Sequence, residues 1–236
     1  DVVIGTHRLL SDDVVCPALG LLIIDEEHRF GVRHKEKIRV VRPDVDVLSL
    51  SATPIPRTFQ QSILGVRDIS RIETPPITRR PIKTYVEYFS WSHSSEIIKK
   101  EVLRGGQVYF LHNDIQSIDY YTKKIQELVP DVVVKNIHGQ QKSKDLEKNL
   151  LGFFGGLISV LVCSTIIESG LDVANANCII INNPQNLGLS QLYQIRGRVG
   201  RGPRQASCYL FIPRKTTLSE AAFRRLKTIE RHTSLG

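Results

Sequence analysis

An apolar run in the first part of the chain ends in acidic residues that could act on a phosphorylated ligand. Leu21 to Ile24 are followed directly by Asp25 and Glu26. If the run is a strand of a parallel sheet, the two acids lie at its carboxyl end, where open α/β sheets bind their ligands. There, Asp25 could hold Mg²⁺ through water, and Glu26 could polarise an attacking water molecule. The alternative is an acidic strand-to-helix turn that caps the next helix.

Two further segments carry polar groups suited to the same chemistry. Residues 51–53 have the sequence Ser-Ala-Thr and follow a second apolar run, so we expect their hydroxyls beside the same sheet edge. Residues 194–201, hereafter the arginine motif, have the sequence Gln-Ile-Arg-Gly-Arg-Val-Gly-Arg. Arg198 and Arg201 are three residues apart, so on a helix they would share one face and could grip one polyphosphate. Alone, an arginine cluster is usually solvated or binds nucleic acid in general. The acid pair, the Ser-Ala-Thr segment and the arginine motif together form a highly specific combination of motifs.

The elements that must position these residues follow an alternating pattern. Short β-rich apolar runs alternate with segments of helical period, which is typical of a parallel sheet covered by helices. Prolines between residues 66 and 81 interrupt the pattern and predict an extended linker. We expect strands at residues 1–4, 20–25, 45–51, 82–88, 107–111, 132–136, 159–163, 178–182 and 207–212, and helices at residues 34–41, 54–64, 92–103, 115–128, 143–154, 189–199 and 218–231. The predicted fold class is α/β, with a complete doubly wound domain after the linker and part of a similar domain before it.

The net charge is concentrated near the end of the chain. The formal net charge is +8 and the pI is about 9.4. Residues 188–236 contain ten Lys or Arg and two Asp or Glu, so this segment accounts for the whole surplus. The surplus indicates an anionic partner without identifying it, and a solvated basic face is the alternative.

Several classes of protein are excluded by composition. No stretch of 18 apolar residues is present, and the first residues lack the order of a signal peptide, so we expect no membrane contact and a cytoplasmic location. The four cysteines have neither CxxC nor zinc-ligand spacing. Cys163 and Cys178 lie in apolar runs, where we expect buried thiols in a reducing compartment.

At these motifs the sequence resembles the superfamily 2 helicases and translocases. Residues 25–28 resemble motif II, residues 51–53 motif III, residues 165–172 motif V, and the arginine motif resembles motif VI. Within the superfamily, the closer resemblance is to the bacterial transcription-repair coupling factors, and it extends over residues 4–7, 25–36, 53–58, 64–68, 105–109 and 165–172. The RecG branch-migration helicases share much of this pattern. Two residues depart from the family, namely Ala174, where proline is usual, and Gly202, where a polar residue is commoner.

The resemblance implies an architecture of two RecA-like lobes of the P-loop NTPase type, each with a parallel sheet. The first lobe would be truncated at its N-terminus and occupy residues 1–78, with motifs Ib, II and III. The second would occupy residues 79–236, with motifs IV, V and VI. The nucleotide would bind between the lobes.

The resemblance also implies roles for individual residues, with ATP as the nucleotide and Mg²⁺ as its metal. The implied catalytic residues are Asp25, which holds Mg²⁺ via water, Glu26, which activates water, and Arg198 and Arg201, of which Arg201 is the arginine-finger candidate. The implied nucleotide-binding residues are Asp25, Glu26, Gln194, Arg198, Arg201, Gly170 and Asp172. Ser51, Ala52 and Thr53 would couple nucleotide state to lobe closure. The residues expected at the DNA backbone are Thr6, His7, Asn113, His138, Gly139 and Thr165.

The implied function is that of a motor segment of an ATP-dependent translocase on double-stranded DNA. Such a protein displaces stalled RNA polymerase and couples transcription to nucleotide excision repair, and its polymerase and repair partners would bind domains absent from this sequence. The sequence has no Gly-x-x-x-x-Gly-Lys-Ser/Thr phosphate loop, so we expect the chain alone to be inactive. The alternatives are a RecG-like helicase that remodels branched DNA and a non-catalytic nucleic-acid-binding module. The carboxylate pair argues against the module, because phosphate binding alone does not require it.

Overall fold

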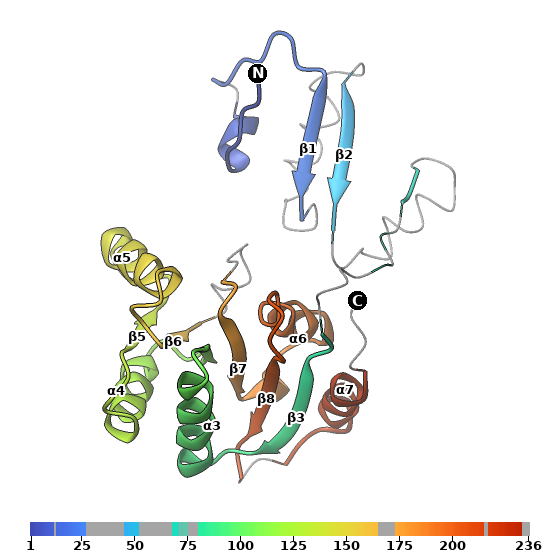
Figure 1. Ribbon diagram of the computed structural model, residues 1–236. Helices are drawn as coiled ribbons and strands as arrows, with labels where there is room; N and C mark the ends of the chain where they lie inside the picture. Colours follow the sequence, from blue (N-terminus) through green and yellow to red (C-terminus); the bar gives the residue numbers. More distant parts are fainter. Residues whose placement is uncertain are drawn as a thin grey trace. The chain divides into compact units, whose positions relative to one another are not determined.

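The chain divides into two compact units, residues 1–71 (unit 1) and residues 72–236 (unit 2) (Figure 1). The computed structural model describes residues 1–11, 13–26, 45–51, 68–70, 72, 74, 80–164, 173–214 and 217–232. Each unit contains a parallel sheet. The assignment of two RecA-like lobes that meet at residue 78 stays a prediction.

Unit 2 is built on a six-stranded sheet in which all neighbouring strands are parallel. The strand order is β3-β8-β7-β4-β6-β5. The strands are β3 (Lys83–Tyr88), β4 (Gln107–Leu111), β5 (Val134–Ile137), β6 (Val160–Cys163), β7 (Ala176–Asn182) and β8 (Ser207–Ile212). Every residue of β4, β6 and β7 is buried, as expected for apolar strands that are covered on both faces. The predicted α/β class with a parallel sheet is confirmed.

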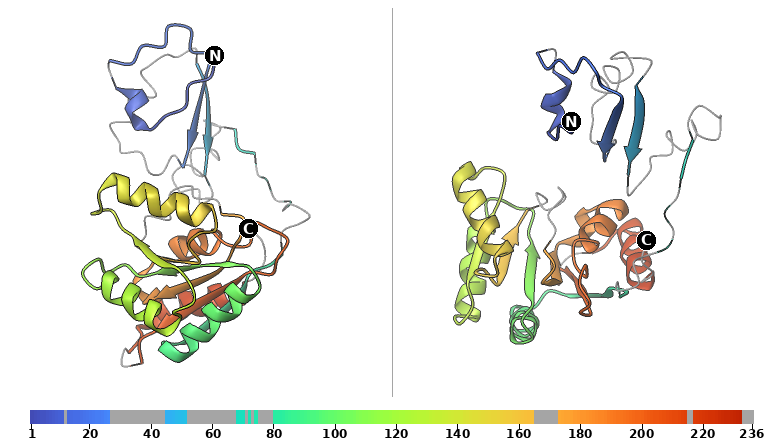
Figure 2. Two further views of the ribbon diagram at one scale, coloured as in Figure 1. Left: turned by 60° about the vertical axis from the view of Figure 1, so that its left-hand side comes forward. Right: turned by 45° about the horizontal axis from the view of Figure 1, so that its top comes forward.

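Helices cover both faces of this sheet, as the two views in Figure 2 show. They are α3 (Trp91–Leu103), α4 (Ile118–Leu128), α5 (Ser143–Phe154), α6 (Leu189–Arg196) and α7 (Glu220–Arg231). Phe110 of β4 packs in one core with residues of α3 and α4, whereas its neighbour Tyr109 packs in the other core with residues of α5, α6 and α7. This alternation follows from the two-residue period of a strand. Among the described helices, none is long and apolar enough to cross a membrane.

Because the six strands are parallel, their connections gather at two opposite edges of the sheet. We call the edge where the strands begin the amino edge and the edge where they end the carboxyl edge. Residues 104–106, 173–175 and 197–206 lie at the amino edge, and residues 112–117 and 138–142 lie at the carboxyl edge. At about 3.3 Å per residue, a five-residue strand such as β4 separates the two edges by roughly 16 Å.

Three predicted elements differ from the structure in their existence or by three residues at one end. The strand predicted at residues 1–4 is wrong, because this segment has no regular structure and pairs with none of the described strands. The helix predicted from residue 115 begins at Ile118, since an Asp114 carboxylate oxygen accepts a bond from the Gln116 N–H in a turn before it. The helix predicted to extend to residue 199 ends at Arg196.

Unit 1 contains a two-stranded parallel sheet and a short 3-10 helix. The elements are η1 (His7–Leu10), β1 (Leu21–Asp25) and β2 (Asp46–Leu50). In β1, Ile24 is buried, whereas Leu21 and Ile23 are 53% and 57% exposed. The predicted helices at residues 34–41 and 54–64 lie outside the described residues.

Candidate nucleotide and nucleic-acid sites

The predicted acid pair lies at the carboxyl end of β1 in unit 1. Asp25 is the exposed last residue of the strand, and Glu26 follows with a left-handed backbone (φ 51°), which turns the chain sharply. The parallel register pairs Asp25 with Leu50, so Ser51 comes next at the same edge. The structure therefore brings these three predicted site residues to one edge of the unit 1 sheet. Ala52 and Thr53 lie outside the described residues.

The donor chemistry at this edge suits the predicted metal. A carboxylate such as that of Asp25 is an oxygen ligand of the kind that Mg²⁺ prefers, usually together with water and phosphate oxygens. Within the described ranges, no group of three or more His, Cys, Asp or Glu could form a metal centre from protein ligands alone.

The arginines of unit 2 lie in a loop at the amino edge rather than on a helix. We call residues 197–206, between α6 and β8, the arginine loop. Helix α6 ends at Arg196, and backbone bonds from Gly197 N–H to Tyr193 O (2.9 Å) and from Arg198 N–H to Ile195 O (3.1 Å) close its last turn. Gly200 has a φ of +74°, which any other residue type would adopt only with strain.

The expectation that Arg198 and Arg201 share one helical face is therefore wrong. Arg198 is half-buried and Arg201 is exposed, both beyond the helix end. The buried side chain of Val199 anchors the loop between them. Gly197 caps the helix, and Gly200, with its positive φ, turns the chain within the loop.

Arg196, which the sequence did not distinguish from its neighbours, has a structural role. It is 5% exposed, and its Nη1 donates to the carbonyl oxygens of Ile229 (3.0 Å) and His232 (2.6 Å) at the end of α7. Its guanidinium also lies 4.7 Å from the ring centroid of Tyr193. Position 196 is four residues after the buried Leu192, and this helical spacing is the signal that could have revealed its burial.

The arginine loop contacts the segment that follows motif V. A Cβ on Gly202 would lie 3.1 Å from the carbonyl oxygen of Ala174, so the two departures from the family pattern adjoin each other. Gln194 is half-buried in α6. Gly170, Asp172 and Thr165 lie outside the described residues.

The predicted DNA-contacting residues of unit 2 lie at the other edge of the sheet. Asn113 follows β4 and is exposed, whereas His138 and Gly139 follow β5 and are half-buried and exposed, respectively. In unit 1, Thr6 is the exposed N-cap of η1, whose Oγ1 accepts a bond from the Arg8 N–H (3.4 Å). The side chain of His7 lies outside the described residues.

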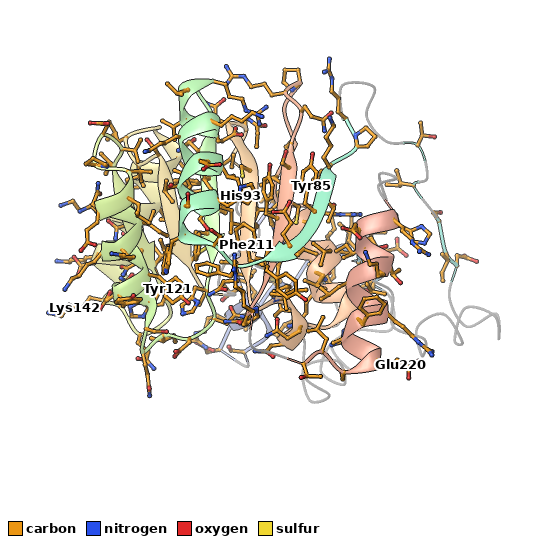
Figure 3. All side chains as sticks on the ribbon, turned by 90° about the horizontal axis from the view of Figure 1, so that it is seen from below. Tyr85, His93, Tyr121, Lys142, Phe211 and Glu220 are labelled. Atoms are coloured by element: carbon orange, nitrogen blue, oxygen red, sulfur yellow. The ribbon has the colours of Figure 1, made fainter. Side chains whose placement is uncertain are left out.

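A buried histidine next to Asn113 organises the loop at residues 112–117. His112 is 3% exposed, and its ring stacks on Tyr121 of α4, labelled in Figure 3, with centroids 3.9 Å apart. The Asn182 amide lies 3.0 Å from His112 Nδ1, and Ser117 Oγ lies 2.8 Å from Nε2. Because the amide N–H can only donate, Nδ1 accepts, so the neutral ring carries its proton on Nε2 and donates to Ser117. Ser117 in turn donates to Asp114 Oδ2 (2.5 Å).

This hydrogen-bond chain requires a neutral imidazole. Burial lowers the pKa of His112, and the nearby Asp114 charge opposes that effect only in part. The hydrogen bond from Ser117 lowers the pKa of Asp114 and keeps it ionised. Asn113 therefore projects from a loop that His112, Ser117 and Asp114 hold in one conformation.

Part of the chain is similar to a described protein family. Residues 92–203 match the family described as helicase conserved C-terminal domain. The matched segment runs from α3 to the arginine loop and is similar to helicase C-terminal domains. The match includes the loop after β4 and the first part of the arginine loop.

Similarity to curated proteins extends over the whole chain. It is 52% identical over all 236 residues to the transcription-repair-coupling factor of Bacillus subtilis (strain 168), of which it covers 20%. It is 50% identical, with the same coverage, to the transcription-repair-coupling factor of Staphylococcus aureus (strain USA300). The resemblance to this family, predicted from the motifs, is confirmed, and the chain spans about a fifth of the length of these relatives.

Solved structures extend the similarity to other helicases. RecG bound to a three-way DNA junction is 36% identical, with a TM-score of 0.75, and the alignment covers 99% of this chain and 31% of that one. Dbp5 of S. cerevisiae, bound to RNA and ADP BeF3, is 15% identical, with a TM-score of 0.68 over 97% of this chain and 61% of that one, and this likeness concerns the fold alone. The relatives are thus coupling factors and RecG-like helicases, and the fold is RecA-like.

Proposed function

We propose that this chain is the motor segment of an ATP-dependent translocase on double-stranded DNA, which displaces stalled RNA polymerase and couples transcription to nucleotide excision repair. The observation that carries the proposal is the identity of 50–52% to coupling factors over every residue of the chain. The polymerase and the repair proteins would be bound by other parts of a longer protein. The DNA substrate implies a cytoplasmic location in a bacterium.

Within this proposal, the acid pair and the arginine loop act on ATP. Asp25 would hold Mg²⁺ through water, and the bound metal would supply neutralisation of the phosphate charge. Glu26 orients the attacking water and accepts its proton. Gln194 and Arg198 bind the nucleotide together with Gly170 and Asp172.

Arg201 is the residue that we assign to the transition state. Arg201 is exposed, whereas Arg196 is buried and bonded to the end of α7. Charge on the transferred phosphoryl group grows during hydrolysis, so a guanidinium placed there lowers the barrier. Residues 51–53 couple the nucleotide state to the movement of the motor.

The opposite edge of the unit 2 sheet is assigned to DNA. Asn113, His138, Gly139 and Thr165 contact the phosphate backbone, together with Thr6 and His7 of unit 1. Contacts to the backbone carry no base information, so binding is expected to be independent of sequence and weakened by salt. In unit 2, the arginine loop lies at one edge of the sheet, and Asn113, His138 and Gly139 lie at the other edge, one strand length away. The sheet joins the two edges and can transmit movement from one ligand to the other.

The experiment that tests the proposal uses the full-length protein that contains this chain. Purified protein is added to a transcription complex stalled on linear DNA, with ATP or without nucleotide, and release of the transcript is measured. ATP-dependent release that a Glu26→Gln variant cannot perform supports the proposal. A protein that hydrolyses ATP on DNA but leaves the stalled complex intact contradicts the polymerase-displacing role.

A RecG-like activity on branched DNA is the second candidate. It is favoured by the identity of 36% and the TM-score of 0.75 with RecG on a three-way junction. The same preparation is incubated with a three-way junction, and ATP-dependent strand separation is followed by gel electrophoresis. Efficient unwinding of the junction, without release of stalled polymerase, would favour this candidate over the first.

A further inference from the structure

A buried carboxylate lies beside the end of the arginine loop at the amino edge. Glu101, in the last turn of α3, is 5% exposed. Its Oε2 accepts a bond from Arg104 Nε (2.8 Å), and Arg104 Nη2 donates to the backbone carbonyl of Gln205 (2.9 Å). Arg104 thus links a buried charge of α3 to the arginine loop, 101 residues further along the chain.

The glycines in the turn after α3 leave room for the Glu101 carboxylate. A Cβ on Gly106 would lie 1.8 Å from Glu101 Oε1, so only glycine leaves room for the carboxylate. Gly105 has a φ of +75°, and a Cβ there would lie 3.3 Å from Nη1 of Arg204, a second residue of the loop. Burial raises the pKa of Glu101, while the charges of Arg104 and Arg204 oppose this effect. The carboxylate is therefore flanked by two arginines and is not a solvated surface group.

A pair of the same spacing on α4 shows what an ordinary surface pair looks like. Lys124 and Glu127 are also three residues apart, and Lys124 Nζ lies 3.0 Å from Glu127 Oε2. The Glu127 side chain is 65% exposed, however, whereas the Glu101 side chain is 6% exposed. Exposed pairs contribute little, because water screens both charges. The hydrogen bond between Lys124 and Glu127 stays within α4, whereas Arg104 bonds to a residue of the arginine loop.

The end of the arginine loop is fixed on its other side as well. Gln205 Nε2 donates to the carbonyl of Pro81 (2.6 Å), and the Lys83 N–H donates to the carbonyl of Ala206 (3.0 Å). At its start, the loop continues the last turn of α6 and is anchored by Val199. Arg201 lies on the short segment between these two fixed ends.

We propose that Glu101 is a positioning residue which, through Arg104, holds the arginine loop in the conformation that presents Arg201 to ATP. The inference rests on the proposed function for the role of Arg201. The positioning itself is a statement about the loop alone. The two parts are therefore tested by different measurements.

Hydrogen exchange of the 236-residue chain tests the positioning. The variants Glu101→Gln and Arg104→Lys are compared with the unaltered chain, and Glu127→Gln is the matched control. Glutamine has the shape of glutamate but lacks its charge, and lysine keeps a charge but cannot donate to Glu101 and Gln205 in the same fork. We expect the amides of residues 197–206 and of Lys83 to exchange about tenfold faster in both variants, since a bond to a charged group is lost. The control is expected to leave them unchanged, and unchanged exchange in both test variants would overturn the inference.

ATP hydrolysis by the full-length protein tests the consequence for catalysis. We expect Glu101→Gln to lower kcat about tenfold and to change KM for ATP by less than about twofold, because only the transition-state contact is displaced. The double variant Glu101→Gln, Arg104→Lys should be no worse than the worse single variant, since both residues act through one contact. A faster-exchanging loop with an unchanged kcat would overturn the catalytic part. Absence of ATPase activity in the unaltered protein would refute the proposed function, while the exchange data would still decide the positioning.

Discussion

At the scale of single residues, three arginines of one eight-residue motif occupy three different environments. Arg196 is buried against α7, Arg198 is half-buried and Arg201 is exposed. All three are guanidinium groups within six positions, so their spacing alone does not separate a structural role from a catalytic one. Burial and hydrogen-bond partners make that distinction.

The first prediction concerns Arg196. Arg196→Ala removes charge-assisted bonds to the carbonyls of Ile229 and His232 and leaves both acceptors poorly satisfied. We expect it to lower the free energy of unfolding by about 2–4 kcal/mol, measured by urea unfolding. Arg224→Ala is the control. The Arg224 side chain is 75% exposed and pairs with the exposed Glu220, so its removal should lower the free energy of unfolding by less than about 1 kcal/mol. Equal costs for the two variants would contradict the structural role of Arg196.

The second prediction concerns Arg201 and depends on the proposed function. Arg201→Ala in the full-length protein should reduce ATP hydrolysis by about 10³ to 10⁵-fold and leave nucleotide binding largely intact. The reason is that an arginine finger contacts charge that develops only in the transition state. Turnover is measured at saturating ATP, and binding is measured with a fluorescent nucleotide, with Arg224→Ala as the control. Weakened binding with unchanged turnover would argue against the finger role.

At the scale of elements, the loop between β4 and α4 shows how a buried residue can order an exposed one. His112 is the first residue after β4, and Ser117 directly precedes α4, so their hydrogen bond spans the loop that contains Asn113. The apolar run of β4 predicted the strand but not this bond. The helix start at residue 118 rather than 115 has the same origin, because Asp114 and Ser117 bond to each other and to the loop backbone.

The third prediction is that acid destabilises unit 2 through His112. The pKa of His112 is lowered in the folded chain, so the unfolded chain takes up a proton first as the pH falls. The contribution of His112 to the free energy of unfolding is therefore fully present above about pH 6.5, the usual pKa of histidine, and it decreases as the pH falls below that value. Urea unfolding between about pH 7.5 and 5.5 is followed by the fluorescence of Trp91, the single tryptophan, which lies in unit 2. His112→Gln should flatten this pH dependence, and an equally steep dependence in the variant would show that other groups cause it.

At the scale of the whole molecule, the parallel sheet of unit 2 separates the candidate sites. The arginine loop lies at the amino edge, and Asn113, His138 and Gly139 lie at the carboxyl edge. One sheet can therefore carry two ligands without overlap. In unit 1, Asp25 and Ser51 share a single carboxyl edge, as the strand register requires.

The fourth prediction concerns the chain as a whole. The 236-residue chain should show little or no ATPase activity, with or without DNA, because its sequence contains no phosphate loop with the lysine that grips the phosphates. The measurement is phosphate release at millimolar ATP, with the full-length protein as the positive control. Substantial DNA-stimulated hydrolysis by the chain alone would contradict it.

Much of the fold and of the candidate site follows from local patterns in the sequence. The apolar runs of β4, β6 and β7 predicted buried parallel strands, because a strand covered on both faces has few polar positions. The acid pair and the Ser-Ala-Thr segment were expected at one edge, and Asp25 and Ser51 lie there. The strand predicted at residues 1–4 was wrong, because pairing depends on a neighbour that composition does not reveal.

The sequence by itself determined the class of fold, the order of its elements and the motifs of a helicase, because these depend on residues that are close along the chain. The tertiary structure alone decided which arginine is buried, that Arg198 and Arg201 lie in a loop, and that Glu101 bonds through Arg104 to Gln205. The burial of Arg196 and the link from Arg104 to the loop arise from residues far apart along the chain, namely Arg196 with Ile229 and Arg104 with Gln205. Spacing along a chain carries no information about such contacts until the sheet and its helices have packed.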